Sequence, residues 1–194
     1  MIMMKKLLAG AAITAIAVTT HTSWAATGDV EATANFVQSI VVTPTVTMDF
    51  GDVGYTAAAP AAGDQIDLGA DAAVTAGGNL SAVGGTPAAG EITVVAAAAN
   101  IDVSCNATAT LAASTGETVT VNNIEYGYNT TPAFGSGSAC DGNAATIAHT
   151  GGTDTISVGA RLDGSTYSAG AYVAGAHNTT NASGVPITFT VVYN

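Results

Sequence analysis

Hydrophobic and polar residues alternate along most of this 194-residue chain, and the clearest run is the last one, residues 186–193. Ile, Phe, Val and Tyr occupy its odd positions, while Pro, Thr and Val occupy its even positions. A repeat of two in β-branched and aromatic residues predicts a strand with one face on a core. An apolar strand without a paired neighbour is an aggregation template, so we expect this segment to lie within a sheet.

Similar short runs recur along the chain, and residues typical of turns separate them. Regularly spaced short strands predict one all-β domain, either a sandwich or a barrel. The predicted strands are 37–43, 45–50, 65–68, 91–98, 101–105, 108–112, 117–126, 153–162, 171–174 and 186–193. Ile187, Phe189, Val191 and Tyr193 are expected to face a core formed with Phe50, Val94, Ile101, Val119, Val121, Ile156 and Val158.

A shorter alternating run covers residues 28–36. Its apolar positions are Val30, Ala32, Ala34 and Phe36, and acidic, amide or hydroxyl residues lie between them. The same phase continues into the next predicted strand, and two strands in series explain such a length better than one, because strands usually have about 3–10 residues. An incomplete sandwich can be completed by an extended segment of a neighbouring subunit. Residues 26–36 are therefore either an ordinary first strand or a donor strand, with the four apolar residues facing the acceptor.

Residues 1–25 have the organisation of a secretory signal peptide. Lys5 and Lys6 form a cationic start, residues 7–20 are uncharged and mostly apolar, and residues 23–25 offer small side chains at the two positions that a signal peptidase reads. The apolar run is shorter than the roughly 20 residues of a membrane-spanning helix, so cleavage after Ala25 is preferred to a retained anchor. We expect a signal peptide over 1–25, an extension or first strand over 26–36, and a β domain over 37–194. The mature chain would have no membrane span.

The chain is strongly acidic, with 14 Asp and Glu residues against three Lys and Arg residues and a formal charge of −11. Two of the three cations lie in the predicted signal peptide, which leaves Arg161 in the exported chain. A surface without cations repels nucleic-acid phosphates and anionic lipids, and this excludes nucleic-acid binding. The acidity is better explained by solubility and by self-repulsion against non-specific association.

Cys105 and Cys140 are the two cysteines of the chain. In an exported protein an even pair predicts a disulfide, and no CxxC or Cys/His spacing indicates a metal site instead. The disulfide would close a loop of about 36 residues, for which the chain-entropy argument gives a stabilisation of about 4 kcal/mol. Its presence implies the periplasm or a compartment beyond it.

Residues that carry catalysis are scarce. After the signal peptide the histidines are His149 and His177, both beside small residues in predicted loops, and we expect both at the surface. The sequence motifs of serine hydrolases, zinc proteases, phosphate-binding loops and dinucleotide-binding folds are absent from the chain. Arg161 lies on a predicted strand and needs only a structural role. We predict that the protein is not an enzyme and that it has no cofactor.

Two other groups of residues have an ordinary explanation beside a functional one. Asp64, Asp67 and Asp71 could supply oxygen ligands for Ca²⁺, but their spacing matches no known calcium loop, and Asp is common in turns. No metal site is therefore predicted. A second group could form an aromatic platform for a sugar, or could cap a core with the hydroxyls at its rim. It consists of Tyr126, Tyr128, Tyr167 and Tyr172.

Three glycine-centred segments, in this order, resemble those of a secreted bacterial family of pilin-like domains of unknown function. They are Met48-Asp-Phe-Gly-Asp-Val-Gly54, Ile156-Ser-Val-Gly-Ala-Arg-Leu162, and the stretch from Gly170-Ala-Tyr172 to the final Thr188-Phe-Thr-Val-Val-Tyr193. The family looks related to fimbrial subunits and to spore-coat-U-like secreted proteins. The resemblance implies an immunoglobulin-like Greek-key β-sandwich, pilin-like, and brings no catalytic residues with it. An insertion-like stretch, residues 175–183, departs from the pattern.

The expected function is that of a secreted structural subunit of a bacterial surface filament, pilus- or fimbria-like, or of a surface layer, which assembles through β-strand pairing. The alternative is a non-catalytic adhesin or glycan-binding surface module. The expected partners are further copies of the chain or other pilin-like subunits. A periplasmic chaperone and an outer-membrane usher are further candidates. The expected location is the cell surface or the exterior, reached through the periplasm.

Overall fold

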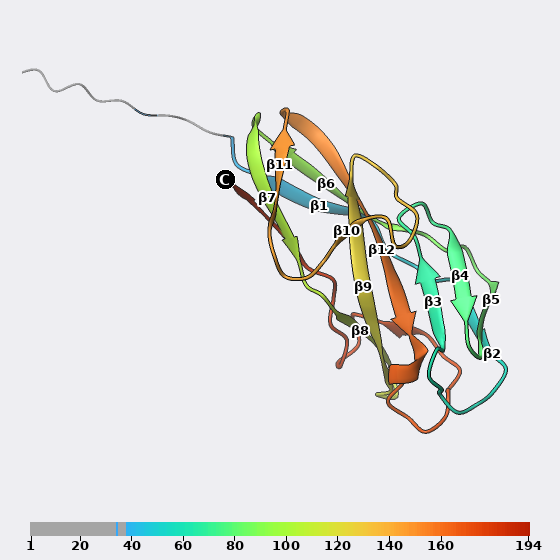
Figure 1. The fold of residues 1–194 in the computed structure, drawn as a ribbon. Coiled ribbons are helices and arrows are strands. Elements are labelled where there is room, and N and C mark those ends of the chain that lie inside the picture. Colours follow the sequence, from blue (N-terminus) through green and yellow to red (C-terminus); the bar gives the residue numbers. More distant parts are fainter. Residues whose placement is uncertain (1–33, 35–37) are drawn as a thin grey trace, which may run out of the picture. The chain divides into compact units, whose positions relative to one another are not determined.

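The structure is a computed structural model that describes Ala34 and residues 38–194 (Figure 1). This part of the chain consists of strands, turns and one short 3-10 helix, η1 (Gly164–Thr166). Within it, no helix is long and apolar enough to cross a membrane. The prediction of an all-β fold is therefore confirmed.

The structure has three sheets, and the largest has nine strands. Its hydrogen-bonded neighbours follow the order β1–β6–β12–β9–β8–β13, and β3, β4 and β10 pair beside this path. Their bounds are β1 (Val41–Val46), β3 (Gln65–Leu68), β4 (Val74–Gly77), β6 (Gly90–Ala96), β8 (Ala109–Ala113), β9 (Thr118–Tyr128), β10 (Ser138–Ala139), β12 (Gly152–Asp163) and β13 (His177–Asn178). Strand β12 is central, because β6 and β3 pair with its two halves and β9 pairs along its other edge. Its pairings are all antiparallel.

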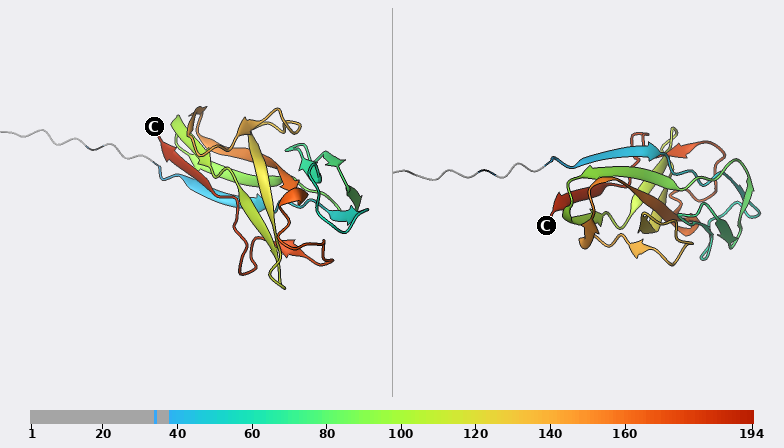
Figure 2. Two further views of the ribbon diagram at one scale, coloured as in Figure 1. Left: turned by 60° about the horizontal axis from the view of Figure 1, so that its bottom comes forward. Right: turned by 90° about the horizontal axis from the view of Figure 1, so that it is seen from above.

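The second sheet has three strands in the order β11–β7–β14, with bounds β11 (Ala145–His149), β7 (Ala99–Cys105) and β14 (Phe189–Tyr193). A two-stranded sheet, β2 (Asp52–Tyr55) and β5 (Leu80–Gly84), lies at the end of the domain away from the C-terminus (Figures 1 and 2). One hydrophobic core is shared by the nine-stranded and three-stranded sheets. Val94 and Ile156 enter it from the larger sheet and Ile101 and Val103 from the smaller one, all with no exposed surface.

The predicted core is confirmed, with one qualification about its last strand. The seven residues predicted to meet that strand are each at most 7 % exposed. In residues 187–193 the odd positions lie inward and the even positions are exposed, as the alternation predicts. However, the inward residues are only half-buried, so the described part of the chain does not cover them completely.

Several strand predictions differ from the structure. Residues 37–43 and 45–50 were expected to form two strands, but one strand, β1, passes through Pro44 with a bulge before Val46. After it, Asp49 forms an isolated bridge to Ala88. The predicted strand 171–174 is wrong. There the side chain of Tyr172 packs against the core, and the backbone forms no strand.

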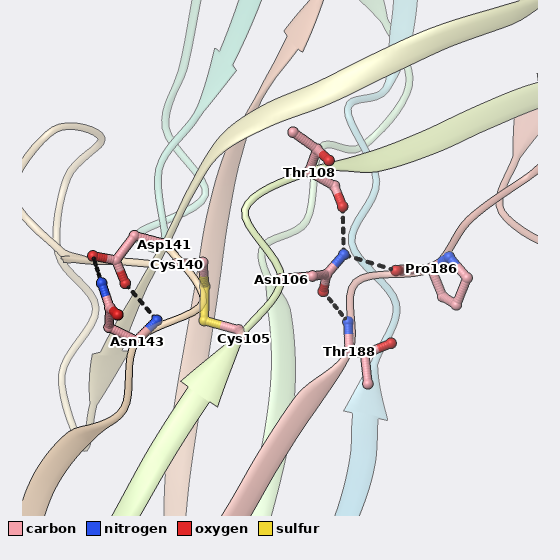
Figure 3. The surroundings of a disulfide bond; sticks show 8 residues. All are labelled: Cys105, Asn106, Thr108, Cys140, Asp141, Asn143, Pro186 and Thr188. Atoms are coloured by element: carbon pink, nitrogen blue, oxygen red, sulfur yellow. Dashed lines mark hydrogen bonds between the residues drawn. A yellow bond between two sulfur atoms is a disulfide. The ribbon is translucent and has the colours of Figure 1, made fainter.

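The predicted disulfide between Cys105 and Cys140 is present, with the two Cα atoms 5.0 Å apart (Figure 3). It joins the end of β7 in the smaller sheet to the residue that follows β10 in the larger one. The next side chain, Asn106, donates to the carbonyl oxygen of Pro186 and accepts from the backbone N–H of Thr188. The disulfide and Asn106 together hold the chain that leads into β14.

Close backbone contacts explain why two positions of the glycine-centred segments are occupied by glycine. Gly51 has a φ of +74°, and a Cβ there would lie 2.8 Å from the carbonyl oxygen of Gly84. Gly159 lies in β12, where a Cβ would come within 2.6 Å of the carbonyl oxygen of Leu68 and 2.7 Å of the backbone nitrogen of Ala70. Both clashes are with backbone atoms, which cannot move aside as a flexible side chain can.

Removing the disulfide should destabilise the domain. For the double variant Cys105→Ser, Cys140→Ser we expect the free energy of unfolding to fall by about 2–4 kcal/mol, because the unfolded chain gains the entropy of an open loop. Urea unfolding followed by tyrosine fluorescence measures this. Reduction of the native protein should give the same shift. An unchanged urea midpoint in both cases would contradict the stabilising role of the disulfide.

Gly159→Ala should also destabilise the domain, by about 1–3 kcal/mol, because the added methyl group overpacks the contact between β12 and the chain that follows β3. Gly170→Ala is the matched control, since a Cβ at Gly170 has no atom within 4 Å. Thermal unfolding of the two variants compares them directly. Equal stabilities would show that β12 adjusts more easily than the geometry indicates.

Candidate functional site

Strand β1 lies at one end of the larger sheet and, in the described chain, pairs only with β6. Val42 lies opposite Val94, and directly opposite residues of neighbouring strands point to the same face of a sheet. Val94 has no exposed surface, whereas Val42 is 36 % exposed. The inner face of β1 is therefore incompletely covered.

Strand β14 is in the same situation at the end of the smaller sheet, where its only strand neighbour among the described residues is β7. Phe189, Val191 and Tyr193 lie opposite Cys105, Val103 and Ile101 respectively. The three β7 residues are at most 5 % exposed, but their β14 partners are half-buried. Both sheets thus end in a strand whose inner face is incompletely covered.

An apolar groove separates these two strands. It has a volume of about 140 Å³ and is lined by Pro44, Val46 and Met48 on the side of β1, by Ile187 and Phe189 on the side of β14, and by Val158 of β12. In Figure 2, β1 (blue) and β14 (dark red) lie toward the same end of the domain as the C-terminus. A narrow apolar site is thus open along the two strand edges.

The groove continues into a wider cleft of about 1080 Å³, and Pro44, Met48 and Ile187 line both. The larger sheet contributes apolar side chains to the cleft, Val119 and Leu162 among them. The segments 47–53 and 173–179 form its other sides. An extended occupant would therefore meet a narrow end and a wide end.

The hydroxyl of Tyr193 forms two hydrogen bonds at the C-terminal end of β14. This hydroxyl accepts a hydrogen bond from the backbone N–H of Ala97 at 2.8 Å and donates to the carbonyl oxygen of Gln38 at 2.6 Å. It therefore ties β14 to the chain on either side of it, including the residues that lead into β1. The position of Gln38 is thereby fixed beside the last residues of β14.

A buried carboxylate holds the rim of the wide end. Asp64 has no exposed surface and accepts hydrogen bonds from the backbone N–H groups of Ala61 and Asn79 and from the hydroxyl of Tyr172, at 2.7–2.9 Å. Burial acts to raise the pKa of Asp64, but the hydrogen bond from Asn79, followed by those from Tyr172 and Ala61, lowers it below its usual value. The carboxylate is therefore ionised and joins three loops.

The other acidic candidates lie apart from it. Asp67 receives two hydrogen bonds from Arg161, at 2.6 and 3.0 Å, which raise the pKa of the guanidinium. Asp71 accepts from the backbone N–H of Ala73 in a turn. Among the described residues, no three His, Cys, Asp or Glu side chains are grouped so that they could hold a metal ion. The three aspartates thus serve the structure separately, and Arg161 has the structural role predicted for it.

The prediction that both histidines lie at the surface is wrong for His149, which is 3 % exposed. Its Nδ1 lies 2.6 Å from Asp154, its Nε2 lies 3.1 Å from the carbonyl oxygen of Ala96, and Tyr128 donates to Asp154 at 2.6 Å. The Tyr128 hydrogen bond is the main cause that lowers the pKa of Asp154. This cluster, which we call the His149 clasp, connects β11 of the smaller sheet to the larger sheet.

The four tyrosines do not form one platform. Tyr126 is 3 % exposed and packs edge-on against Phe189, and Tyr128 belongs to the His149 clasp. Tyr167 and Tyr172 do meet, with ring centroids 5.0 Å apart. The ring that continues this row is Tyr55, 5.3 Å from Tyr172, and His177 extends it beyond Tyr167. Sequence reasoning missed Tyr55, which lies on a strand that the weak alternation of its region did not reveal.

The candidate donor segment lies almost entirely outside the described residues. Val30, Ala32 and Phe36 are among the residues that the structure does not describe, and Ala34 is described and exposed. Its assignment as first strand or donor strand therefore stays a prediction. What the structure adds is an open apolar groove between β1 and β14, which the sequence did not indicate.

Comparison with known families gives one match. A family described as a domain of unknown function, DUF4402, matches residues 40–182. The chain belongs to the DUF4402 family. The match contains the first two glycine-centred segments and the start of the third, and it supports the expectation of a family of domains of unknown function. No curated protein and no solved structure matches the chain.

Lowering the pH should destabilise the domain partly through Asp64. The folded-state pKa of this group is lowered, so its contribution to stability is present above the unfolded value of about 3.9 and is lost as the pH falls through and below it. Asp64→Asn should therefore lower stability at neutral pH and flatten the loss between about pH 4 and pH 2. Asp52→Asn, at an exposed position of β2, should leave neutral stability nearly unchanged. Urea midpoints against pH measure both, and parallel profiles for wild type and Asp64→Asn would contradict the assignment.

Proposed function

We propose that this DUF4402 protein is a secreted structural subunit of a bacterial surface filament, pilus- or fimbria-like, or of a surface layer, and that it assembles through β-strand pairing. The observation that carries the proposal is the presence of two edge strands, β1 and β14, with an open apolar groove between them. Among the described residues, each is paired with another strand on one side only. Residues 1–25 act as a signal peptide, and the mature subunit reaches the cell surface through the periplasm. Its partners are further copies of the chain or other pilin-like subunits, with a chaperone and an usher as candidate export factors.

The chemistry of the two edges supports association. Proteins usually protect edge strands with charged residues, bulges or prolines. Neither β1 nor β14 contains a charged residue, and β1 has only Pro44 and its bulge. Burying a Val side chain contributes about 1.5–3 kcal/mol. Val42 and Val46, at 36 % and 43 % exposure, retain part of that free energy for a partner.

The proposal includes a finer description of the fold. The two sheets with a shared core are arranged as an immunoglobulin-like Greek-key sandwich, pilin-like, in which no strand of the described chain occupies the edge position beside β14. The half-buried inner residues of β14 support this description, because a complete sandwich would cover them. The same residues explain why pairing at this edge would be favourable.

A structural role also agrees with the polar groups of the domain. Asp64, the Asp67–Arg161 pair and the His149 clasp all have partners within the fold, and each joins separate segments. We propose no enzymatic activity. The second candidate function, a non-catalytic adhesin or glycan-binding module, is favoured by the ring row of Tyr55, Tyr172, Tyr167 and His177 at the cleft. Glycan-array binding by the monomer that is lost in Tyr55→Ala would favour it over the structural role.

Introducing a charge at the β1 edge should prevent assembly. We expect Val42→Lys to remain a folded monomer under conditions in which the wild-type protein forms oligomers or fibres, because a charged side chain on the inner face of β1 would have to be buried beneath the partner. Val83→Lys, at a 65 % exposed position of β5, is the matched control and should assemble. Light scattering after size-exclusion chromatography and electron microscopy measure the outcome. Assembly of Val42→Lys at the wild-type level would contradict the role of the edge.

A further inference from the structure

We infer that the wide cleft is a binding site for a small organic cation with an apolar ring body, such as an aryl-substituted quaternary ammonium. This ligand goes beyond the proposed structural function, and its site is complete within one copy of the chain. Three observations carry the inference: the size and apolar floor of the cleft, the row of rings along its side, and the sign of its charged residues.

The floor of the cleft is formed by apolar side chains on the inner face of the larger sheet. They are Leu111 of β8, Val119 and Val121 of β9, and Leu162 of β12. The cleft volume of about 1080 Å³ is close to the upper end for small-molecule pockets, which measure about 300–1,000 Å³. Covering apolar surface is favourable, so a floor of this kind favours a ligand with an apolar ring system.

The segment 173–179 forms one side of the cleft, and the fold holds it at both ends. Before its start, the Tyr172 hydroxyl donates to the buried carboxylate of Asp64, and the Tyr172 backbone N–H donates to the carbonyl oxygen of Ala58 at 2.7 Å. Near its end, β13 pairs with β8. These contacts keep the segment in place without a ligand, so the cleft is pre-formed, as small-molecule sites usually are.

A row of four rings borders the cleft, and its exposed end is Tyr55. Successive ring centroids lie 5.3, 5.0 and 5.5 Å apart, in the order Tyr55, Tyr172, Tyr167 and His177. The hydroxyls of Tyr172 and Tyr167 have hydrogen-bond partners within the fold, whereas Tyr55 is 43 % exposed. The faces of aromatic rings attract cations, quaternary ammonium groups among them. The ring of Tyr55 is therefore the expected contact of a cation.

The charged residues at the cleft have one sign. Asp49 and Asp52 line it and are exposed, and among the described residues no Lys or Arg lines it. His177 places its Nδ1 3.0 Å from the carbonyl oxygen of Gly175 and its Nε2 3.2 Å from the Tyr167 hydroxyl, and an uncharged imidazole satisfies both contacts. An anionic ligand would therefore meet two carboxylates without a counter-charge, whereas a cation would be attracted.

The positions of these groups give the ligand an orientation. Asp52 and Tyr55 belong to the same short strand, β2, at the end of the domain away from the C-terminus, and both are exposed (Figure 1). The cationic group is therefore expected beside β2, and the ring body over Val119 and Leu162. In this orientation the charge keeps its contact with water, which avoids the cost of burying it.

Three probes that share one scaffold test the inference: biphenylmethyl trimethylammonium, biphenylmethanol and biphenylcarboxylate. Isothermal titration calorimetry of the exported protein, at a concentration at which it is monomeric, measures their binding. We expect the ammonium probe to bind with one-to-one stoichiometry, the alcohol about five-fold more weakly, and the carboxylate more weakly still. Equal affinities for the three probes, or no binding of the ammonium probe, would overturn the inference.

Variants separate the ring contact from the charge. Tyr55→Ala should weaken binding of the ammonium probe about five-fold, because it removes the exposed ring. Val83→Ala, at a 65 % exposed position that does not line the cleft, is the matched control and should bind as the wild type does. The double variant Asp49→Asn, Asp52→Asn should weaken binding of the ammonium probe and leave that of the alcohol unchanged. Wild-type affinity of Tyr55→Ala would overturn the assigned site.

Nuclear Overhauser effects place the bound probe directly. We expect contacts from its ammonium methyl protons to the Tyr55 ring, and from its biphenyl protons to the methyl groups of Val119 or Leu162. Contacts confined to other parts of the acidic surface would overturn the inference. Circular dichroism of each variant separates loss of binding from loss of folding. These outcomes are independent of the proposed assembly, because none of the variants changes β1 or β14.

Discussion

The unequal size of the two main sheets is the constraint from which the other features of this domain follow. Three strands face a sheet of nine, so the smaller sheet does not cover the whole inner face of the larger one. Val94 is completely buried, but its neighbour across the ladder, Val42, is more than a third exposed. The groove and the wider cleft lie where that cover ends. An uncovered apolar face costs free energy, so covering it would be favourable.

A small sheet with one open side needs anchors other than strand pairing. The Cys105–Cys140 disulfide, the His149 clasp and the Tyr193 hydroxyl each connect the three-stranded sheet to the larger one at a different place. Asn106 holds the chain that enters β14. These links hold the two ends of β14, although among the described residues one of its sides has no neighbouring strand. A groove held in shape in this way would lower the entropic cost of binding for an occupant.

The sequence predicted the parts of the fold that alternation alone can specify. Strands β7, β9, β12 and β14 are rich in Val, Ile and Thr, and their bounds were close to those observed. Strands β2, β4 and β5 were missed because their Ala and Gly residues give little contrast between the two faces. The cluster around Asp64 was beyond sequence reasoning, since its donors Asn79 and Tyr172 lie 15 and 108 residues away. The groove was equally hidden, because a vacancy depends on which strands pair, and single-strand patterns do not show pairing.

The distribution of charge complements the open edge. Arg161 is the single Lys or Arg residue between positions 38 and 194, and it is paired with Asp67. Two copies therefore repel each other at long range, over a distance of about 8 Å at physiological salt. At short range, β1 and β14 present apolar groups without charge. Electrostatic repulsion opposes every approach of two copies. In contrast, the free energy of burying the apolar groove is available only to a segment whose side chains fit it. The proposed assembly would therefore need no charged residue on the edge itself, because the acidic surface already opposes non-specific association.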